Sequence, residues 1–92
     1  MNRLDNATAL TLDERAKELH NLIYQQEMQW RSHNRGRYPQ SLYIGCEDHA
    51  ILRDNETTRL DFESRANGEV YYRGYRLFVV TDKTHLKFVM SV

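Results

Sequence analysis

Three arginines, two aromatic rings and an asparagine fall within the nine residues from Trp30 to Tyr38. No acidic residue occurs between Glu27 and Glu47, although the chain carries 13 positive and 13 negative residues in all. A local positive run flanked by rings can hold phosphates and bases, or dock on an acidic partner. The run therefore predicts a binding surface. Its candidate contact residues are Arg31, His33, Asn34, Arg35, Arg37 and Tyr38.

The individual residues of this run suggest different roles. Guanidinium groups can engage phosphates through two parallel hydrogen bonds, and His33 or Asn34 could read the edge of a base. Trp30 lies on an apolar helical stripe and is expected to belong to the core. Three explanations of the arginines stay open: a nucleic-acid contact, an acidic protein partner, and a solvated helix end that complements the helix dipole.

A second basic and aromatic run places three tyrosines and two arginines between Tyr71 and Arg76. Rings borne on a sheet beside arginines stack bases in several RNA-binding modules. Tyr72, Arg73 and Arg76 are therefore further candidate contact residues. The same tyrosines could equally be ordinary strand residues half-buried beneath a helix, and both interpretations stay open.

Residues that could support covalent or metal chemistry are sparse. Cys46 and His49 are spaced as C-x-x-H, but no third group is placed to orient such a pair, and Cys46 is expected to be a small packed strand residue. The four histidines share no metal-binding spacing, and no Gly-rich phosphate loop or nucleophile elbow occurs. We expect a protein that is not an enzyme and that uses no metal, cofactor or small-molecule substrate.

The first basic run must be positioned by a long helix. Thr11 and Glu14 form a Thr-x-x-Glu capping box at its start, and Gly36 with Pro39 bars continuation at its end. Apolar residues recur between these signals at helical spacing. They are Leu12, Ala16, Leu19, Ile23 and Trp30. The sequence predicts a helix over 11–35, preceded by a flexible arm over 1–10.

From residue 41 the apolar pattern changes to alternation, which is typical of strands. Residues 41–46, 57–64, 70–72, 75–81 and 85–91 are expected to be strands, while 47–56 stays undecided between helix and strand. Asn67-Gly68 predicts a tight hairpin. The expected fold is a single α+β domain over 1–92, with one long N-terminal helix packed on a four- or five-stranded antiparallel sheet over 41–92.

Composition limits the class of protein further. Zero net charge excludes a simple basic coat protein for nucleic acid and a strongly acidic DNA mimic. Residues 28–46 carry three positive and no negative charges, whereas residues 47–66 carry three and six, which suits a partner made of both protein and nucleic acid. One cysteine cannot form an internal disulfide, and no apolar run approaches the ~20 residues of a membrane helix. We expect an intracellular protein.

The short length, the missing catalytic motif, the helix over 11–34 and the run Val70-Tyr71-Tyr72-Arg73-Gly74-Tyr75-Arg76 resemble small phage-encoded anti-CRISPR proteins directed at the type I-F surveillance complex. The resemblance implies a non-enzymatic inhibitor in the host cytoplasm. It would bind protein subunits of the complex, with the guide RNA as a further contact, and block pairing of target DNA. A monomer or weak dimer is expected. The alternative is a phage virion or assembly protein that oligomerises through its sheet.

Overall fold

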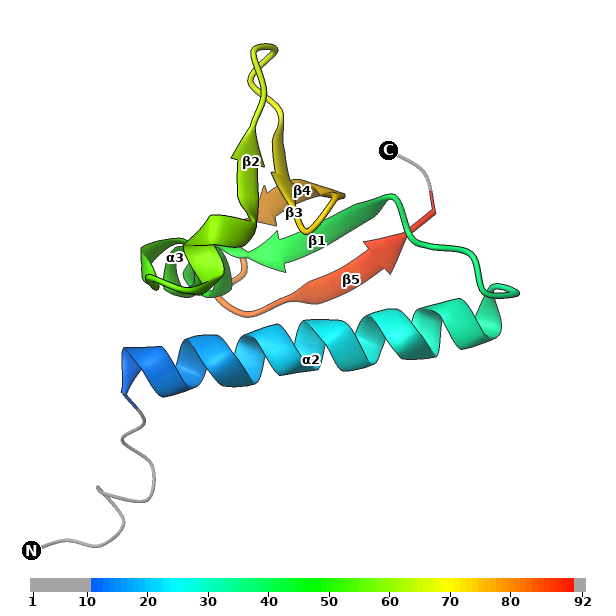
Figure 1. Ribbon diagram of the computed structural model, residues 1–92, viewed down its shortest axis with the longest axis horizontal. Coiled ribbons are helices and arrows are strands. Elements are labelled where there is room, and N and C mark those ends of the chain that lie inside the picture. Colours follow the sequence, from blue (N-terminus) through cyan, green and yellow to red (C-terminus); the bar gives the residue numbers. More distant parts are fainter. Residues whose placement is uncertain (1–10, 91–92) are drawn as a thin grey trace, which may run out of the picture.

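The computed structural model describes residues 11–90, so the arm predicted over 1–10 lies outside the described residues. The described chain folds around one sheet (Figure 1). Its elements are, in order, α2 (Leu12–His33), β1 (Ser41–Gly45), α3 (Cys46–Asp54), the 3₁₀ helix η1 (Thr58–Asp61), β2 (Phe62–Ser64), β3 (Val70–Tyr72), β4 (Tyr75–Val80) and β5 (Leu86–Val89). The α+β class is confirmed.

The five strands lie in the order β2-β3-β4-β1-β5. β1 pairs with β4 in parallel and with β5 in antiparallel orientation, while β2-β3 and β3-β4 are antiparallel. The prediction of a purely antiparallel sheet is therefore wrong. The reason is the crossover: α3, η1 and the β2-β3 hairpin intervene between β1 and β4, and that path returns the chain alongside β1 in the same direction.

The predicted helix over 11–35 corresponds to α2, which ends at His33. Its capping box is confirmed, because the Thr11 hydroxyl accepts a hydrogen bond from the Glu14 amide (3.1 Å) and the Glu14 carboxylate accepts one from the Thr11 amide (3.2 Å). α2 runs along the sheet (Figure 1) and turns its apolar stripe toward it. Within residues 11–90, no helix combines the length and apolar character that crossing a bilayer requires.

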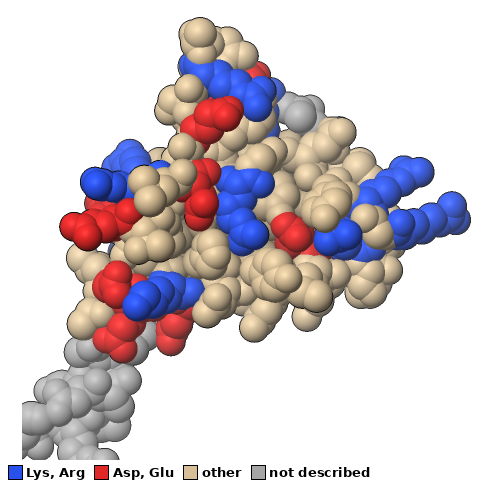
Figure 2. Space-filling model, in the orientation of Figure 1, with Lys and Arg blue, Asp and Glu red and all other residues tan. Residues whose placement is uncertain are grey.

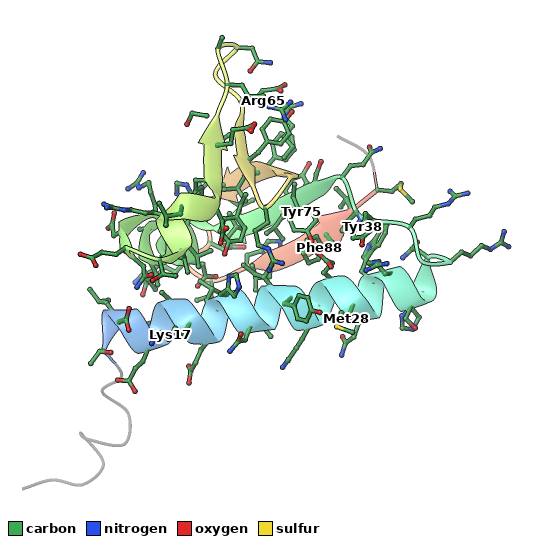
Figure 3. The ribbon with its side chains drawn as sticks, viewed as in Figure 1. Lys17, Met28, Tyr38, Arg65, Tyr75 and Phe88 are labelled. Atoms are coloured by element: carbon green, nitrogen blue, oxygen red, sulfur yellow. The ribbon has the colours of Figure 1, made fainter. Side chains whose placement is uncertain are left out.

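The core lies between the sheet and the two α-helices. Leu19 and Ile23 of α2 and Leu52 of α3 pack against strand residues. Tyr75 and Phe88 meet edge to face, with ring centroids 5.0 Å apart (Figure 3). The other buried strand residues of this cluster are Leu42, Ile44, Tyr72 and Leu77. Trp30 is half-buried against the same cluster, so the prediction that it belongs to the core is confirmed in part.

Side chains alternate between the two faces of a strand, so the neighbours of the core residues point to the opposite side of the sheet. We call this side the outer face. Its central residues pair across neighbouring strands and are Tyr43, Tyr71, Arg76, Phe78 and Lys87.

The strand predicted over 57–64 begins only at Phe62. Hydrogen bonds between side chains and backbone close a turn instead: the Thr58 hydroxyl donates to the Leu52 carbonyl (2.5 Å), and the Asn55 side chain accepts from the Thr58 amide (3.0 Å). Residues 47–56 resolve largely as helix α3. Cys46 is the exposed first residue of that helix, so its prediction as a packed strand residue is wrong.

The tight turn of the hairpin region lies at Arg73-Gly74, where both residues have positive φ (51° and 90°) and join Tyr72 to Tyr75. Asn67-Gly68 lies in the turn of the β2-β3 hairpin, as predicted: the Gly68 amide donates to the Arg65 carbonyl and the Arg65 amide to the Glu69 carbonyl (both 2.9 Å), so this turn is one residue longer than the turn at Arg73-Gly74. The ribbon formed by β2 and β3 projects away from the rest of the sheet (Figure 1).

Candidate nucleic-acid interface

The first predicted run forms a turn at the C-terminal end of α2. The Gly36 amide donates to the Arg31 carbonyl (2.8 Å), and Arg35 and Gly36 both have positive φ (57° and 77°). His33 and Asn34, the two residues predicted to contact base edges, hydrogen-bond to carbonyl groups of α2 instead. The Asn34 side-chain amide donates to the Trp30 carbonyl (2.6 Å), and His33 Nδ1 lies 2.8 Å from the Gln29 carbonyl oxygen. Both side chains therefore help to terminate the helix.

Arg31 fixes the segment that leaves α2. Its guanidinium carbon lies 3.9 Å from the centroid of the Tyr38 ring, and its Nε donates to the Gly36 carbonyl (3.4 Å). Tyr38 is nevertheless 61% exposed and lies beside the end of α2 (Figure 3). This contact orders an arginine and a ring on the surface.

Arg35 and Arg37 are exposed next to this pair. No carboxylate within residues 11–90 lies within salt-bridge distance of Arg31, Arg35 or Arg37. Long cationic side chains extend from this end of the molecule (Figure 2). We call Arg31, Arg35, Arg37 and Tyr38 the terminal basic cluster.

The other three candidates lie elsewhere. Tyr72 is fully buried, and its hydroxyl lies 2.9 Å from His20 Nδ1, so its prediction as a contact residue is corrected: strand alternation turns it into the core. Arg73 occupies the β3-β4 turn, with its guanidinium carbon 5.7 Å from the Tyr24 ring centroid. Arg76 lies on the outer face. Sequence reasoning had placed these three residues in one surface.

The outer face carries a row of stacked groups that sequence reasoning identified only in part. Tyr43 and Phe78 stack with centroids 5.0 Å apart and an interplanar angle of 23°. The Arg76 guanidinium carbon lies 4.7 Å from the Phe78 ring centroid, and its Nη1 lies 3.2 Å from Glu69 Oε2. The sequence carries a signal for both: Tyr43 lies between the apolar residues Leu42 and Ile44, and Phe78 follows Leu77, each within a predicted strand.

Tyr71 and Arg65 continue this row toward the tip of the hairpin (Figure 3 labels Arg65). The Arg65 guanidinium carbon lies 3.7 Å from the Tyr71 ring centroid, and Arg65 Nε lies 3.1 Å from Glu63 Oε2. The Tyr71 hydroxyl donates to Glu69 Oε1 (2.8 Å). This hydrogen bond lowers the pKa of Glu69 and raises the pKa of Tyr71. Glu69 is therefore ionised at neutral pH and can hold Arg76.

Cys46 and His49, the pair with C-x-x-H spacing, make separate contacts. The Cys46 thiol donates to the Thr81 carbonyl (3.5 Å), whereas His49 packs edge-on against Phe62 with ring centroids 5.6 Å apart. Burial lowers the pKa of His49, with a smaller effect from Arg53. No group of three or more His, Cys, Asp or Glu residues within 11–90 is arranged to hold a metal ion.

A hollow of about 460 Å³ lies at the other end of α2, between its first turn and α3. Its rim holds charges that are already paired: Asp13 accepts a hydrogen bond from Asn55 (2.7 Å), and Arg15 lies 3.7 Å from Glu47. The Asn55 hydrogen bond, with Lys17, lowers the pKa of Asp13. Of the acidic residues that line this hollow, Asp13, Glu47 and Asp54 are paired with cations of the protein, and Glu56 is the one without a salt bridge to residues 11–90.

Comparison of the chain with known proteins gives no match to a family model, a curated protein or a solved structure.

Proposed function

We propose that this protein acts by binding, without chemistry of its own, and that the terminal basic cluster contacts phosphates of an RNA held in a ribonucleoprotein. The observation that carries the proposal is that Arg35 and Arg37 are exposed beside Tyr38 without a carboxylate partner in residues 11–90. Arginine forks bind phosphate in a bidentate manner, and a neighbouring ring can stack on a base.

The charge distribution favours a mixed partner over free nucleic acid. The net charge is zero, so the chain lacks the excess positive charge that drives non-specific binding to a polyanion. Acidic side chains gather near the start of α2, opposite the terminal basic cluster (Figure 2). The acidic residues that line the hollow there are Asp13, Glu47, Asp54 and Glu56. A partner that presents both phosphates and lysines would meet unpaired arginines at one end and, at the other, Glu56 and carboxylates whose salt bridges are exposed to solvent.

The narrower proposal is that the partner is the type I-F CRISPR surveillance complex and that the protein is a phage inhibitor acting in the host cytoplasm. Its support is the resemblance in length and in the tyrosine-rich hairpin sequence. In RNA-guided complexes, target DNA pairs with the guide along a positively charged channel in a nearly balanced exchange of duplexes. An inhibitor seated there needs only to block the path, with its acidic end toward channel lysines and its basic end toward the guide.

The test is a pull-down from host lysate, with and without RNase, followed by target-DNA binding by the purified complex. The variant Arg35→Ala/Arg37→Ala should weaken capture about tenfold or more, equivalent to about 1.4 kcal/mol. Arg53→Ala/Arg59→Ala is the matched control, because it removes the same charge from exposed residues of α3 and η1. Capture that is unchanged in the first variant would refute the role of the cluster. Capture without effect on target-DNA binding would refute the narrower proposal.

A second candidate function is assembly through the sheet, and one observation favours it. β3 pairs with β4 only at Tyr75 and Arg76, whereas β1 pairs with β4 as far as Val80. The second half of β4 therefore has an edge that no strand within residues 11–90 covers, and Val79 there is 49% exposed. Such edges add strands from other chains. Sedimentation should then show a closed oligomer at micromolar concentration that Val79→Lys disrupts, whereas a monomer would contradict assembly.

A further inference from the structure

We infer that the outer face of the sheet stacks unpaired bases of a single-stranded nucleic acid, using the Arg65–Tyr71 and Arg76–Phe78 pairs as two ready-made platforms. The inference rests on the proposed function only in taking nucleic acid as the class of partner. It adds a second surface, separate from the terminal basic cluster, and it assigns the base-contacting role to residues of the sheet.

The outer face is available to a ligand. α2 and α3 pack against the core on the opposite side of the sheet. Within residues 11–90, the outer face therefore bears only the side chains of its own strands and of the β2-β3 loop. Tyr43, Tyr71 and Phe78 are each partly exposed there. Three aromatic rings on the side of the sheet away from both helices are an unusual use of large side chains, unless another group packs on them.

The two arginines are already ordered on their rings. Arg65 lies 3.7 Å from the Tyr71 centroid while Glu63 holds its Nε at 3.1 Å, and half of the Arg65 side chain stays exposed. One side of its planar guanidinium therefore faces the ring, and a base can stack on the other. Because Glu63 fixes the fork, the side chain loses little conformational freedom when a base binds.

Arg76 repeats this arrangement one strand further along. Glu69 holds its Nη1 at 3.2 Å, and the guanidinium lies over Phe78, which in turn stacks on Tyr43. Tyr71 is directly opposite Arg76 across β3 and β4. Opposite side chains of neighbouring strands lie about 5 Å apart and diagonal ones about 7–8 Å apart, so the two platforms can serve two neighbouring bases of one strand.

Magnitudes favour a ligand over a closed structural network. An exposed cation–π contact changes an equilibrium by about 2- to 5-fold. Stacking of a base on an aromatic side chain changes affinity by about 5- to 150-fold per base. If a base stacks on one of these rings in place of the guanidinium, the affinity gained from base stacking therefore exceeds the stabilisation lost from the cation–π contact.

Charge at one border of the outer face fits a phosphate backbone. Lys87 of β5 is exposed directly opposite Tyr43. Beyond the end of β5, Met90 shares a shallow hollow with Arg35 and Arg37. A strand whose bases lie on Phe78 and Tyr71 can thus carry its phosphates past Lys87 toward the terminal basic cluster. Only unpaired nucleotides offer free base faces, which commits the ligand to a single strand.

The test is fluorescence anisotropy with a labelled single-stranded oligouridylate of about eight nucleotides, within the usual range of site sizes, and with a duplex RNA of the same length. The full chain should bind the single strand more tightly than the duplex. Tyr71→Leu, which keeps an apolar side chain but removes the ring, and Arg65→Ala should each weaken binding about tenfold. Tyr24→Leu is the matched control, because Tyr24 is an exposed tyrosine of α2.

A second readout is the shift of ring-proton NMR signals of Tyr43, Tyr71 and Phe78 on addition of the oligonucleotide, which also shows that each variant is folded. Equal binding by Tyr71→Leu, Arg65→Ala and the unaltered chain would overturn the inference, as would absent ring shifts or tighter binding of the duplex. Arg35→Ala/Arg37→Ala is measured in parallel. Loss of ribonucleoprotein capture in that variant, with no oligonucleotide effect in the sheet variants, refutes the outer face and leaves the proposed function standing.

Discussion

At the residue scale, six arginines of this protein differ in whether they contact an aromatic ring. Four of them lie over aromatic rings, with guanidinium-to-centroid distances between 3.7 and 5.7 Å. The pairs are Arg31–Tyr38, Arg65–Tyr71, Arg73–Tyr24 and Arg76–Phe78. Arg35 and Arg37 instead reach solvent without such a contact. Arg65 and Arg76 are ordered on rings of the outer face, whereas Arg35 and Arg37 of the terminal basic cluster are not, which fits the different roles proposed for the two surfaces.

Tyr72 provides a prediction that separates a core role from a contact role. Its hydroxyl lies 2.9 Å from His20 Nδ1 in a buried position. Tyr72→Phe removes this hydrogen bond and leaves His20 without that partner, so the free energy of unfolding at neutral pH should fall by about 1 kcal/mol. Urea denaturation measures the change. Tyr38→Phe, at an exposed ring, should leave stability unchanged.

The same residue predicts a pH dependence. Burial, and then the nearby charge of Asp61, raises the pKa of Tyr72 to about 12 from an ordinary value of 10.0. Between these values the native phenol keeps a proton that the unfolded chain loses, so the free energy of unfolding falls as the pH rises from about 10 to about 12. Tyr72→Phe should show a smaller fall over this interval. An identical pH profile in the variant would contradict this assignment.

At the element scale, the direct junction of β1 with α3 depends on the turn before β5. Gly45 and Cys46 donate amide hydrogen bonds to the His85 and Asp82 carbonyls (2.8 and 2.9 Å). The buried Asp48 carboxylate accepts one from the His85 amide (3.0 Å). The Cys46 bond satisfies one of the amides that the first turn of a helix leaves unpaired, and the Glu47 and Asp48 amides likewise donate to the Lys83 carbonyl (3.1 and 3.3 Å). The turn thereby fixes the helix that covers one end of the core.

This junction predicts a severe effect of Gly45→Ala. A β-carbon at Gly45 would lie 2.7 Å from the His85 amide nitrogen and closer still to the Lys83 carbonyl oxygen. Both are backbone atoms that cannot rotate away, so the free energy of unfolding should fall by more than about 3 kcal/mol. Gly68→Ala is the comparison, since its φ of 86° is unfavourable but the space is open; it should cost about 1 kcal/mol. Equal stability of the two variants would contradict the clash.

At the scale of the whole molecule, α2 separates an acidic end from a basic end. Its 22 residues span about 33 Å, which is several times the ~8 Å Debye length at physiological salt. The two ends therefore act as independent electrostatic sites despite the net charge of zero. The outer face lies on the side of the sheet away from α2. Its border at β5 leads to the terminal basic cluster, because Met90, which follows β5, lies next to Arg35 and Arg37.

This arrangement predicts that salt and stacking effects can be separated. Each phosphate contact with a single strand contributes a slope of about −0.7 in the logarithm of affinity against that of salt concentration. Arg35→Ala/Arg37→Ala should therefore reduce the slope for oligouridylate by about 1.4, whereas Tyr71→Leu should lower affinity at an unchanged slope. Anisotropy titrations between about 50 and 200 mM salt measure both. A reduced slope in Tyr71→Leu would contradict the division of roles.

Local patterns in the sequence determined the long helix, its capping box, the end of the helix near Gly36 and the exposure of the arginines that follow. These features depend on residues close together in the chain, so spacing and capping chemistry suffice to predict them. The alternation of the strands also determined which residues share a face, although it left open which face would be covered.

Only the tertiary structure decided the direction of β4 relative to β1, the burial of Tyr72 and the meeting of Tyr43, Tyr71, Arg76 and Phe78 on one face. Strand order depends on the crossover through α3, and the covered face depends on where α2 packs. Both result from contacts between segments distant in the chain, which a pattern of neighbouring residues does not encode. The basic run after α2 was therefore visible in the sequence, whereas the stacked row on the outer face exists only in the fold.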